Sequence, residues 1–130
     1  MKSETMTAAT EDYLEAILIL AKAKGSARSV DIAALLDVSK PAVHKATHTL
    51  KALGLITQEP YGGLALTEAG RSIASKVLRR HNIIKEFLID HLGVSAETAE
   101  IDACKIEHNI STETLKAIKL KLMFHENGVN

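Results

Sequence analysis

The chain has 130 residues and a formal net charge of zero, with 46% hydrophobic but only 3% aromatic residues. This length allows one core or two small cores that share an interface, and the scarcity of aromatic side chains favours an aliphatic, mainly helical interior. The same scarcity argues against binding of single-stranded nucleic acid, because such proteins stack bases on aromatic rings. The one cysteine excludes an internal disulfide, and no apolar run is long enough to span a membrane. Because the opening residues are polar and unlike a signal peptide, we expect a soluble, cytoplasmic protein.

The spacing of apolar residues predicts two helices in the first third of the chain. The first covers residues 7–24 and ends at Gly25, and the second covers residues 30–36. A turn and a third helix follow, because Ser39 is a good N-cap and Gly54 is a typical C-terminal stop. The expected inward face of this third helix consists of Val43, Ala46, Leu50 and Leu53.

The period of the apolar pattern changes after the third helix. Residues 55–58 and 64–67 are β-compatible runs on either side of a turn that contains proline and glycine, which predicts a small hairpin. Helix, helix, turn, helix and hairpin in this order are typical of a winged helix-turn-helix domain. Three further helices, the first of them long, are expected after the capping residues Thr67, Ser95 and Ser111. The fold class is therefore predicted to be mainly α, with a winged helix-turn-helix followed by a helical C-terminal half.

The start of the third helix has side chains suited to DNA. Lysines and a helix N-terminus favour phosphates, while short or polar side chains can approach base edges in the major groove. The alternative interpretation is a solvated helix face that happens to be basic. The position of the helix, after a short turn and before a hairpin, favours DNA. The predicted DNA-contacting residues are Ser39, Lys40, Pro41, Ala42, His44 and Lys45.

The stretch CKIEH contains three side chains that can ligate a metal ion. Cys104, Glu107 and His108 are spaced so that a helix would place the thiol, the carboxylate and the imidazole on one face. A free cysteine is, however, often only a small buried hydrophobe. The spacing alone therefore leaves both interpretations open.

Two further features are candidates for the same chemistry. His81 occupies a core position of the long helix, in an apolar stripe with Val77 and Ile84, although a lone core histidine is more often structural than a ligand. Asp12 and Glu15 are three residues apart and border the apolar stripe of the first helix. Sequence spacing does not show that these groups meet.

Five segments of the chain together resemble a known family. They are TEDYLEAI, SKPAVHKATHTLKALGLI, GLALTEAG, RRHNIIKEFL and ACKIEHNIS, and the resemblance around them extends from about residue 7 to 122. Their types and order are similar to those of the metal-dependent repressors of the diphtheria toxin repressor and manganese transport regulator family. The resemblance implies a winged helix-turn-helix DNA-binding domain over residues 1–70 and a helical metal-binding and dimerisation domain over residues 71–130. It also implies a transition-metal site formed by Asp12, Glu15, His81, Cys104, Glu107 and His108.

The chain departs from the family pattern at several positions. Cys104 replaces the carboxylate of the manganese branch, which argues against two closely spaced ions and leaves the number of bound ions open. The iron branch has an ancillary site that needs an acid and a histidine where this chain has Lys85 and Glu100, so that site is expected to be absent or rebuilt. Because the chain ends soon after Met123, the SH3-like third domain of longer members is expected to be missing.

The function that the resemblance implies is repression of transcription, not enzymatic catalysis. The chain would bind a double-stranded DNA operator as a homodimer, with Fe(II) or Mn(II) as co-repressor, and would control genes of metal uptake or homeostasis. Zn(II), Co(II) or Ni(II) could bind in vitro, because affinity follows the Irving–Williams order. The dimer is expected to form through the C-terminal half, where apolar residues recur at helical spacing at Leu115, Ile118 and Leu122.

Two alternatives from other classes remain at this point. One is a winged-helix regulator that binds no metal and senses a small ligand, or senses oxidation through Cys104. The other is a hydrolase, which is disfavoured because Cys104 and His108 share one helix turn and no oxyanion or substrate-positioning motif is visible.

Overall fold

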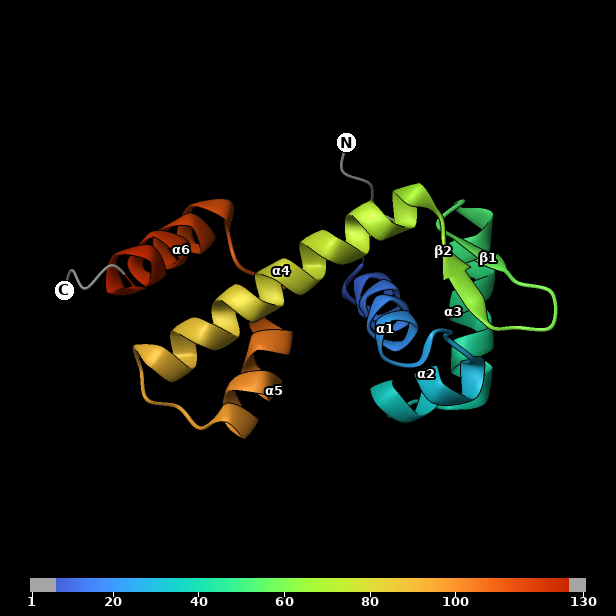
Figure 1. Cartoon of the computed structure of the whole chain (residues 1–130), viewed down its shortest axis with the longest axis horizontal. Coiled ribbons are helices and arrows are strands. Elements are labelled where there is room, and N and C mark those ends of the chain that lie inside the picture. The colour runs from blue at the N-terminus through green and yellow to red at the C-terminus, as the bar shows by residue number, and fades with distance from the viewer. Residues whose placement is uncertain (1–6, 127–130) are drawn as a thin grey trace. The chain divides into compact units, whose positions relative to one another are not determined.

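A computed structural model describes the backbone of residues 7–126 and the side chains of residues 7–124. Over this part the chain forms six helices and one two-stranded antiparallel sheet (Figure 1). The elements are α1 (Ala8–Lys24), α2 (Ser29–Leu36), α3 (Lys40–Ala52), β1 (Ile56–Gln58), β2 (Leu64–Leu66), α4 (Glu68–Asp90), α5 (Ala96–Ile106) and α6 (Thr112–Glu126). The chain divides into two compact units, and the boundary lies between Lys76 and Val77, within α4. The prediction of a mainly α fold is confirmed.

Side-chain hydroxyls cap five of the helices in the described residues, four of them at the predicted residues, whereas α2 begins without a side-chain cap. In each cap a hydroxyl accepts a hydrogen bond from a backbone N–H three residues further along, at 3.1–3.2 Å, which satisfies one of the donors left open at a helix start. The capping residues are Thr7, Ser39, Thr67, Ser95 and Ser111. Gly25, with a φ of 84°, ends α1 in the left-handed conformation that glycine adopts without strain.

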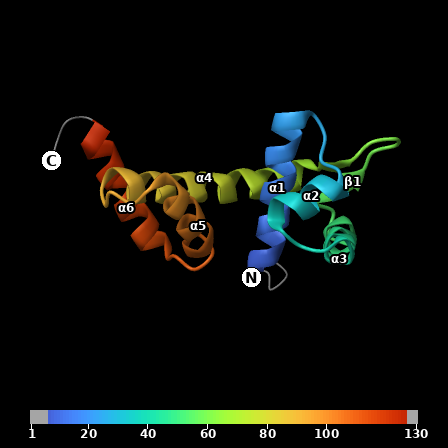
Figure 2. The ribbon, with the colours of Figure 1, turned by 90° about the horizontal axis from the view of Figure 1, so that it is seen from below.

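The first unit is a winged helix-turn-helix. Helices α1, α2 and α3 pack on one another, and the β1–β2 hairpin packs on α1 and α3 (Figures 1 and 2). Its wing, defined here as β1, β2 and the connecting residues 59–63, extends beyond the helices of the unit, and Tyr61 in that connection is fully exposed. The aliphatic core of this unit includes Leu14, Ile17, Leu18, Ile32, Val43, Leu50, Ile56 and Leu64.

One expectation for α3 is wrong. Leu53 is 38% exposed, although it was expected on the inward face. The reason is that α3 ends at Ala52 and Leu53 is its C-cap, so the helical spacing no longer directs the side chain inward. Thr47 is buried with Val43 and Leu50, and its hydroxyl donates to the carbonyl of His44 at 3.1 Å, which satisfies the buried oxygen.

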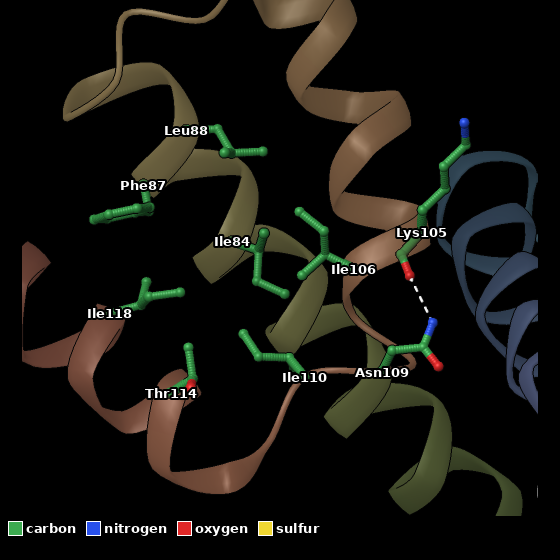
Figure 3. A pocket seen from close by; sticks show the side chains of 9 residues that line it. All are labelled: Ile84, Phe87, Leu88, Lys105, Ile106, Asn109, Ile110, Thr114 and Ile118. Atoms are coloured by element: carbon green, nitrogen blue, oxygen red, sulfur yellow. Dashed lines mark hydrogen bonds between the residues drawn. The ribbon is translucent and has the colours of Figure 1, made fainter.

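The second unit contains the C-terminal part of α4 together with α5 and α6. Val77, His81 and Ile84 form a buried stripe on α4, and Ala99 and Ala103 are the buried residues of α5. An apolar groove of about 470 Å³ lies in this unit (Figure 3). Side chains from all three helices and from the α5–α6 connection line it, among them Ile84, Phe87, Leu88, Ile106, Ile110 and Ile118. In the described part of the chain, no helix is both long and apolar enough to cross a membrane.

Candidate metal centre

His81 lies at the middle of the candidate site in the second unit. Its place in the buried stripe of α4 leaves it only 5% exposed. Its Nδ1 is 2.8 Å from Oε1 of Glu107, and its Nε2 is 3.0 Å from Oε1 of Glu100. Both ring nitrogens therefore contact a carboxylate, and both carboxylates come from α5 or its C-terminal end.

Glu107 is the most deeply buried acidic side chain of this cluster, at 2% exposure. Helix α5 ends at Ile106, but Glu107 keeps helical backbone angles and its N–H donates to the carbonyl of Ala103. The carboxylate is therefore directed as if the helix continued. Its own backbone carbonyl accepts a hydrogen bond from Nε of Arg80 at 3.2 Å, which ties the end of α5 to α4.

The three candidate ligands of the CKIEH stretch converge. One ligand atom each from Cys104, Glu107 and His108 lies within 4.8 Å of the others. Nε2 of His108 is 3.4 Å from Oε2 of Glu107, on the opposite carboxylate oxygen from the one that contacts His81. The spacing of three and four residues thus brings the three side chains together, as expected, even though Glu107 and His108 follow the end of α5.

The contacts of His81 change its protonation. The hydrogen bond with Glu107 is the largest influence, and together with Glu100 it outweighs burial and raises the pKa of His81 from 6.5 to about 9. Burial works against ionisation of Glu100, but hydrogen bonds from His81 and Lys85 prevail and lower the pKa of that carboxyl. Without metal, the site thus contains an imidazolium between two carboxylates.

Lys85 and Glu100 form an ion pair at the position where the iron branch was expected to need an acid and a histidine. Nζ of Lys85 is 3.0 Å from Oε1 of Glu100, the same oxygen that contacts His81. Sequence reasoning noted both residues only as departures and did not foresee this network. Two spacings in the sequence could have indicated the network. Glu100 precedes Cys104 by one helix turn, and Lys85 follows His81 by one helix turn, so each lies on the same helix face as a candidate ligand.

The residues of the second unit fit a transition-metal ion. Oε2 of Glu107 is buried and has no hydrogen-bond donor in the described part of the chain, which is costly for a carboxylate oxygen. It lies 3.4 Å from the imidazole of His108, and the Glu107 carboxylate clusters with the thiol of Cys104; imidazole and thiol both ligate transition metals.

Asp12 and Glu15 belong to the first unit, one turn apart on α1. Asp12 is partly buried and Glu15 is buried, and buried acidic side chains in proteins are nearly always paired. Their role as metal ligands stays a prediction.

The predicted DNA-contacting residues lie at the N-terminal end of α3. Ser39 is the N-cap, where its hydroxyl oxygen accepts from the N–H of Ala42, and Ala42 is half-buried. The remaining side chains of the predicted set are exposed and line a shallow surface hollow, namely Lys40, Pro41, His44 and Lys45. Two lysines, a histidine and a helix N-terminus on one exposed surface suit a phosphate backbone.

Comparison with known families identifies the chain. Residues 5–64 match the family described as iron dependent repressor, N-terminal DNA binding domain, and residues 67–127 match iron dependent repressor, metal binding and dimerisation domain. The chain therefore belongs to the iron-dependent repressor family, and the resemblance inferred from its motifs is confirmed.

Among curated relatives, the chain is similar to the transcriptional regulator MntR of Escherichia coli, with 44% identity over 115 residues that cover 88% of this chain and 74% of the relative. It is 39% identical over 116 residues to an uncharacterized HTH-type transcriptional regulator of Methanocaldococcus jannaschii, which covers 88% of this chain and 93% of the relative.

Two solved structures extend the comparison. The manganese regulator SloR is 30% identical with a TM-score of 0.79, and the match covers 88% of this chain. The IdeR of T. acidophilum is 28% identical with a TM-score of 0.78, and the match covers 99% of this chain. The present chain spans 54% of the SloR chain and 56% of the IdeR chain, so it corresponds to just over half of each.

Proposed function

We propose that the chain is a repressor of transcription that binds operator DNA as a homodimer when its metal site is loaded. The observation that carries the proposal is the buried Glu107 carboxylate, which clusters with the ligand atoms of Cys104 and His108 and whose Oε2 has no hydrogen-bond donor in the described residues. The manganese-dependent regulators among similar solved structures favour Mn(II), and the imidazole and thiol donors favour Fe(II), as the physiological co-repressor.

The proposed ligands are His81, Cys104, Glu107 and His108 of the second unit, together with Asp12 and Glu15 of α1, which the family resemblance adds. A bound divalent cation would supply the positive charge that this set of carboxylates and a thiolate lacks. Because the set draws on both units, its occupation would favour one arrangement of the DNA-binding unit over others. The coupling of metal and DNA binding follows from that preference.

Helix α3 is the proposed recognition helix. Lys40, His44 and Lys45 are exposed at its N-terminal end, where lysines and backbone N–H groups favour phosphates. In a two-fold dimer, two such helices separated by one turn of DNA, about 34 Å, would contact an operator with matching symmetry.

The proposed dimer surface is the apolar face of the second unit. Large apolar side chains are exposed on α5, on α6 and in the α4–α5 connection of the second unit, which is unfavourable in water unless a partner covers them. The most exposed are Leu92, Ile101, Leu120, Met123 and Phe124. The groove in Figure 3 adds further apolar surface to this unit. The genes proposed to be under control are those of metal uptake or homeostasis.

A metal-independent regulator that senses oxidation through Cys104 is the alternative. It would require an accessible thiol, whereas Cys104 is only partly exposed and belongs to a cluster of possible metal ligands. The two functions differ in whether removal of metal abolishes DNA binding.

The decisive experiment measures operator affinity by fluorescence anisotropy, anaerobically, with and without Mn(II) or Fe(II). The DNA is selected in vitro with the metal-loaded protein. His81→Ala and the more conservative Glu107→Gln should each abolish the metal-stimulated part of binding and leave the weak metal-free binding in place. Exposed Glu97→Ala on α5 is the matched control. A wild-type metal response in both site variants, with native circular dichroism, would refute the site.

Cys104→Ser tests the contribution of the thiol to metal choice. A hydroxyl is a poor ligand for softer ions, so the variant should lose its Fe(II) and Zn(II) responses more than its Mn(II) response. An unchanged ranking of the metals would assign Cys104 a packing role only.

A further inference from the structure

The two ring nitrogens of His81 face different surroundings. An imidazole directs Nδ1 and Nε2 apart, so only one of them can join the cluster around Glu107. Nδ1 is the nitrogen that contacts Glu107, at 2.8 Å, whereas Nε2 contacts Glu100 at 3.0 Å. The structure therefore distinguishes a nitrogen on the side of Glu107 from a nitrogen on the side of Glu100.

The carboxylate oxygens on the two sides of His81 differ in their hydrogen-bond partners. On the first side, the buried Oε2 of Glu107 has no hydrogen-bond donor among the described residues, and Cys104 and His108 lie nearby. On the second side, Nζ of Lys85 is 3.0 Å from the same Glu100 oxygen that contacts His81. The side chain of Glu100 is also 55% exposed, which weakens any attraction to a further cation.

We infer that Glu100 is a positioning residue, which accepts the N–H of His81 Nε2 and so directs the lone pair of Nδ1 to the metal. Histidine ligands in proteins commonly donate their second N–H to a carboxylate, which fixes the ring orientation and raises the basicity of the ligating nitrogen. Lys85 holds Glu100 in place through their ion pair. This inference rests on the proposed metal site and specifies which nitrogen of His81 it uses.

The first experiment measures the affinity of the full chain for Mn(II) by competition with a fluorescent chelator. Glu100→Ala should weaken Mn(II) binding roughly 10-fold, the lower end of the 10- to 100-fold effect of such partners, because water can partly replace an exposed carboxylate. Glu100→Gln should stay within about threefold of the wild type, since its amide oxygen still accepts the N–H. Glu97→Ala, one turn earlier on α5, should have no effect.

The second experiment records ¹H–¹⁵N correlation spectra of the histidine rings in the Zn(II)-loaded full chain, with His81 assigned through His81→Gln. We expect a proton on Nε2 and the zinc-induced shift on Nδ1. A zinc-induced shift on Nε2 would overturn the inference, as would unchanged Mn(II) affinity in Glu100→Ala. Equal losses in Glu100→Ala and Glu100→Gln would also overturn it, because they would make the carboxylate itself a ligand. Unchanged Mn(II) affinity in His81→Ala would instead refute the proposed metal site.

Discussion

Burial of a carboxylate destabilises a protein unless a positive charge or hydrogen-bond donors accompany it, and Glu107 shows which groups accompany such a carboxylate in the metal-free chain. One of its oxygens contacts His81, the other faces His108, and its backbone carbonyl accepts from Arg80. With its pKa raised to about 9, His81 supplies positive charge near neutral pH. The protonated imidazole thus gives the buried carboxylate a positively charged neighbour.

The stability of the metal-free protein should therefore fall as the pH rises from 6.5 to 9. The folded-state pKa of His81 is about 9, above its ordinary value of 6.5, so the folded chain holds a proton that the unfolded chain releases in this range. Its contribution is complete below pH 6.5 and is lost as the pH passes the folded-state pKa. The expected loss is on the order of 2–3 kcal/mol. Urea unfolding with a chelator present, at fixed protein concentration, measures it.

His81→Gln is the control for this pH dependence, because glutamine can hydrogen-bond but does not titrate. The variant should be less stable than the wild type at pH 6 and close to it at pH 9.5. Parallel stability curves for the two proteins across this range would contradict the assignment of the proton to His81.

At the scale of elements, the wing and the start of α4 depend on close backbone contacts in the first unit. Thr67 donates its hydroxyl to the carbonyl of Gly54 at 2.8 Å, and its N–H donates to the carbonyl of Leu55 at 3.0 Å. Gly70, in the first turn of α4, lies so near that a Cβ there would collide with the carbonyl oxygen of Leu55. The residues just before β1 and the first turn of α4 are therefore in close contact, with no room for a side chain at position 70.

Gly70→Ala should destabilise the protein, although alanine favours helices by about 1 kcal/mol over glycine. The collision with the Leu55 carbonyl has to be relieved by a backbone shift, and overpacking of this kind typically costs about 1–3 kcal/mol. Exposed Ser72→Ala in the same helix should change stability by no more than about 0.5 kcal/mol. Urea unfolding of both variants measures the difference. A Gly70→Ala protein more stable than the wild type would show that the contact is loose.

The sequence predicted local structure better than long-range contacts. Caps at Ser39, Thr67 and Ser95 could be predicted because each depends on a neighbour three residues away. The convergence of Cys104 with Glu107 and His108 was predictable for the same reason. The pairing of His81 with Glu100 was not, because 19 residues separate them and only the packing of α5 on α4 brings them together.

At the scale of the whole molecule, a net charge of zero conceals an uneven distribution that suits a DNA-binding protein. Between Asp37 and Glu59 there is no acidic residue, and this segment contains α3 with its lysines and histidines. If α3 is the recognition helix, as proposed, this basic segment should supply a large share of the attraction to DNA, separately from the candidate metal ligands of the second unit.

Lys45→Ala tests this separation of roles. Lys45 is exposed in the second turn of α3, so its loss should weaken binding to all DNA sequences alike and lower the slope of log affinity against log salt concentration by roughly 1 per subunit. Affinity for Mn(II) should stay at the wild-type value. Lys22→Ala is the matched control, because it removes the same charge from an exposed position on α1. Fluorescence anisotropy across a salt series, with the selected operator and with a scrambled sequence, provides the measurement.

Unchanged operator affinity would mean that α3 is not the recognition helix. A variant that binds the scrambled sequence normally but loses the operator would instead show that Lys45 contacts a base, because a phosphate contact cannot distinguish sequences.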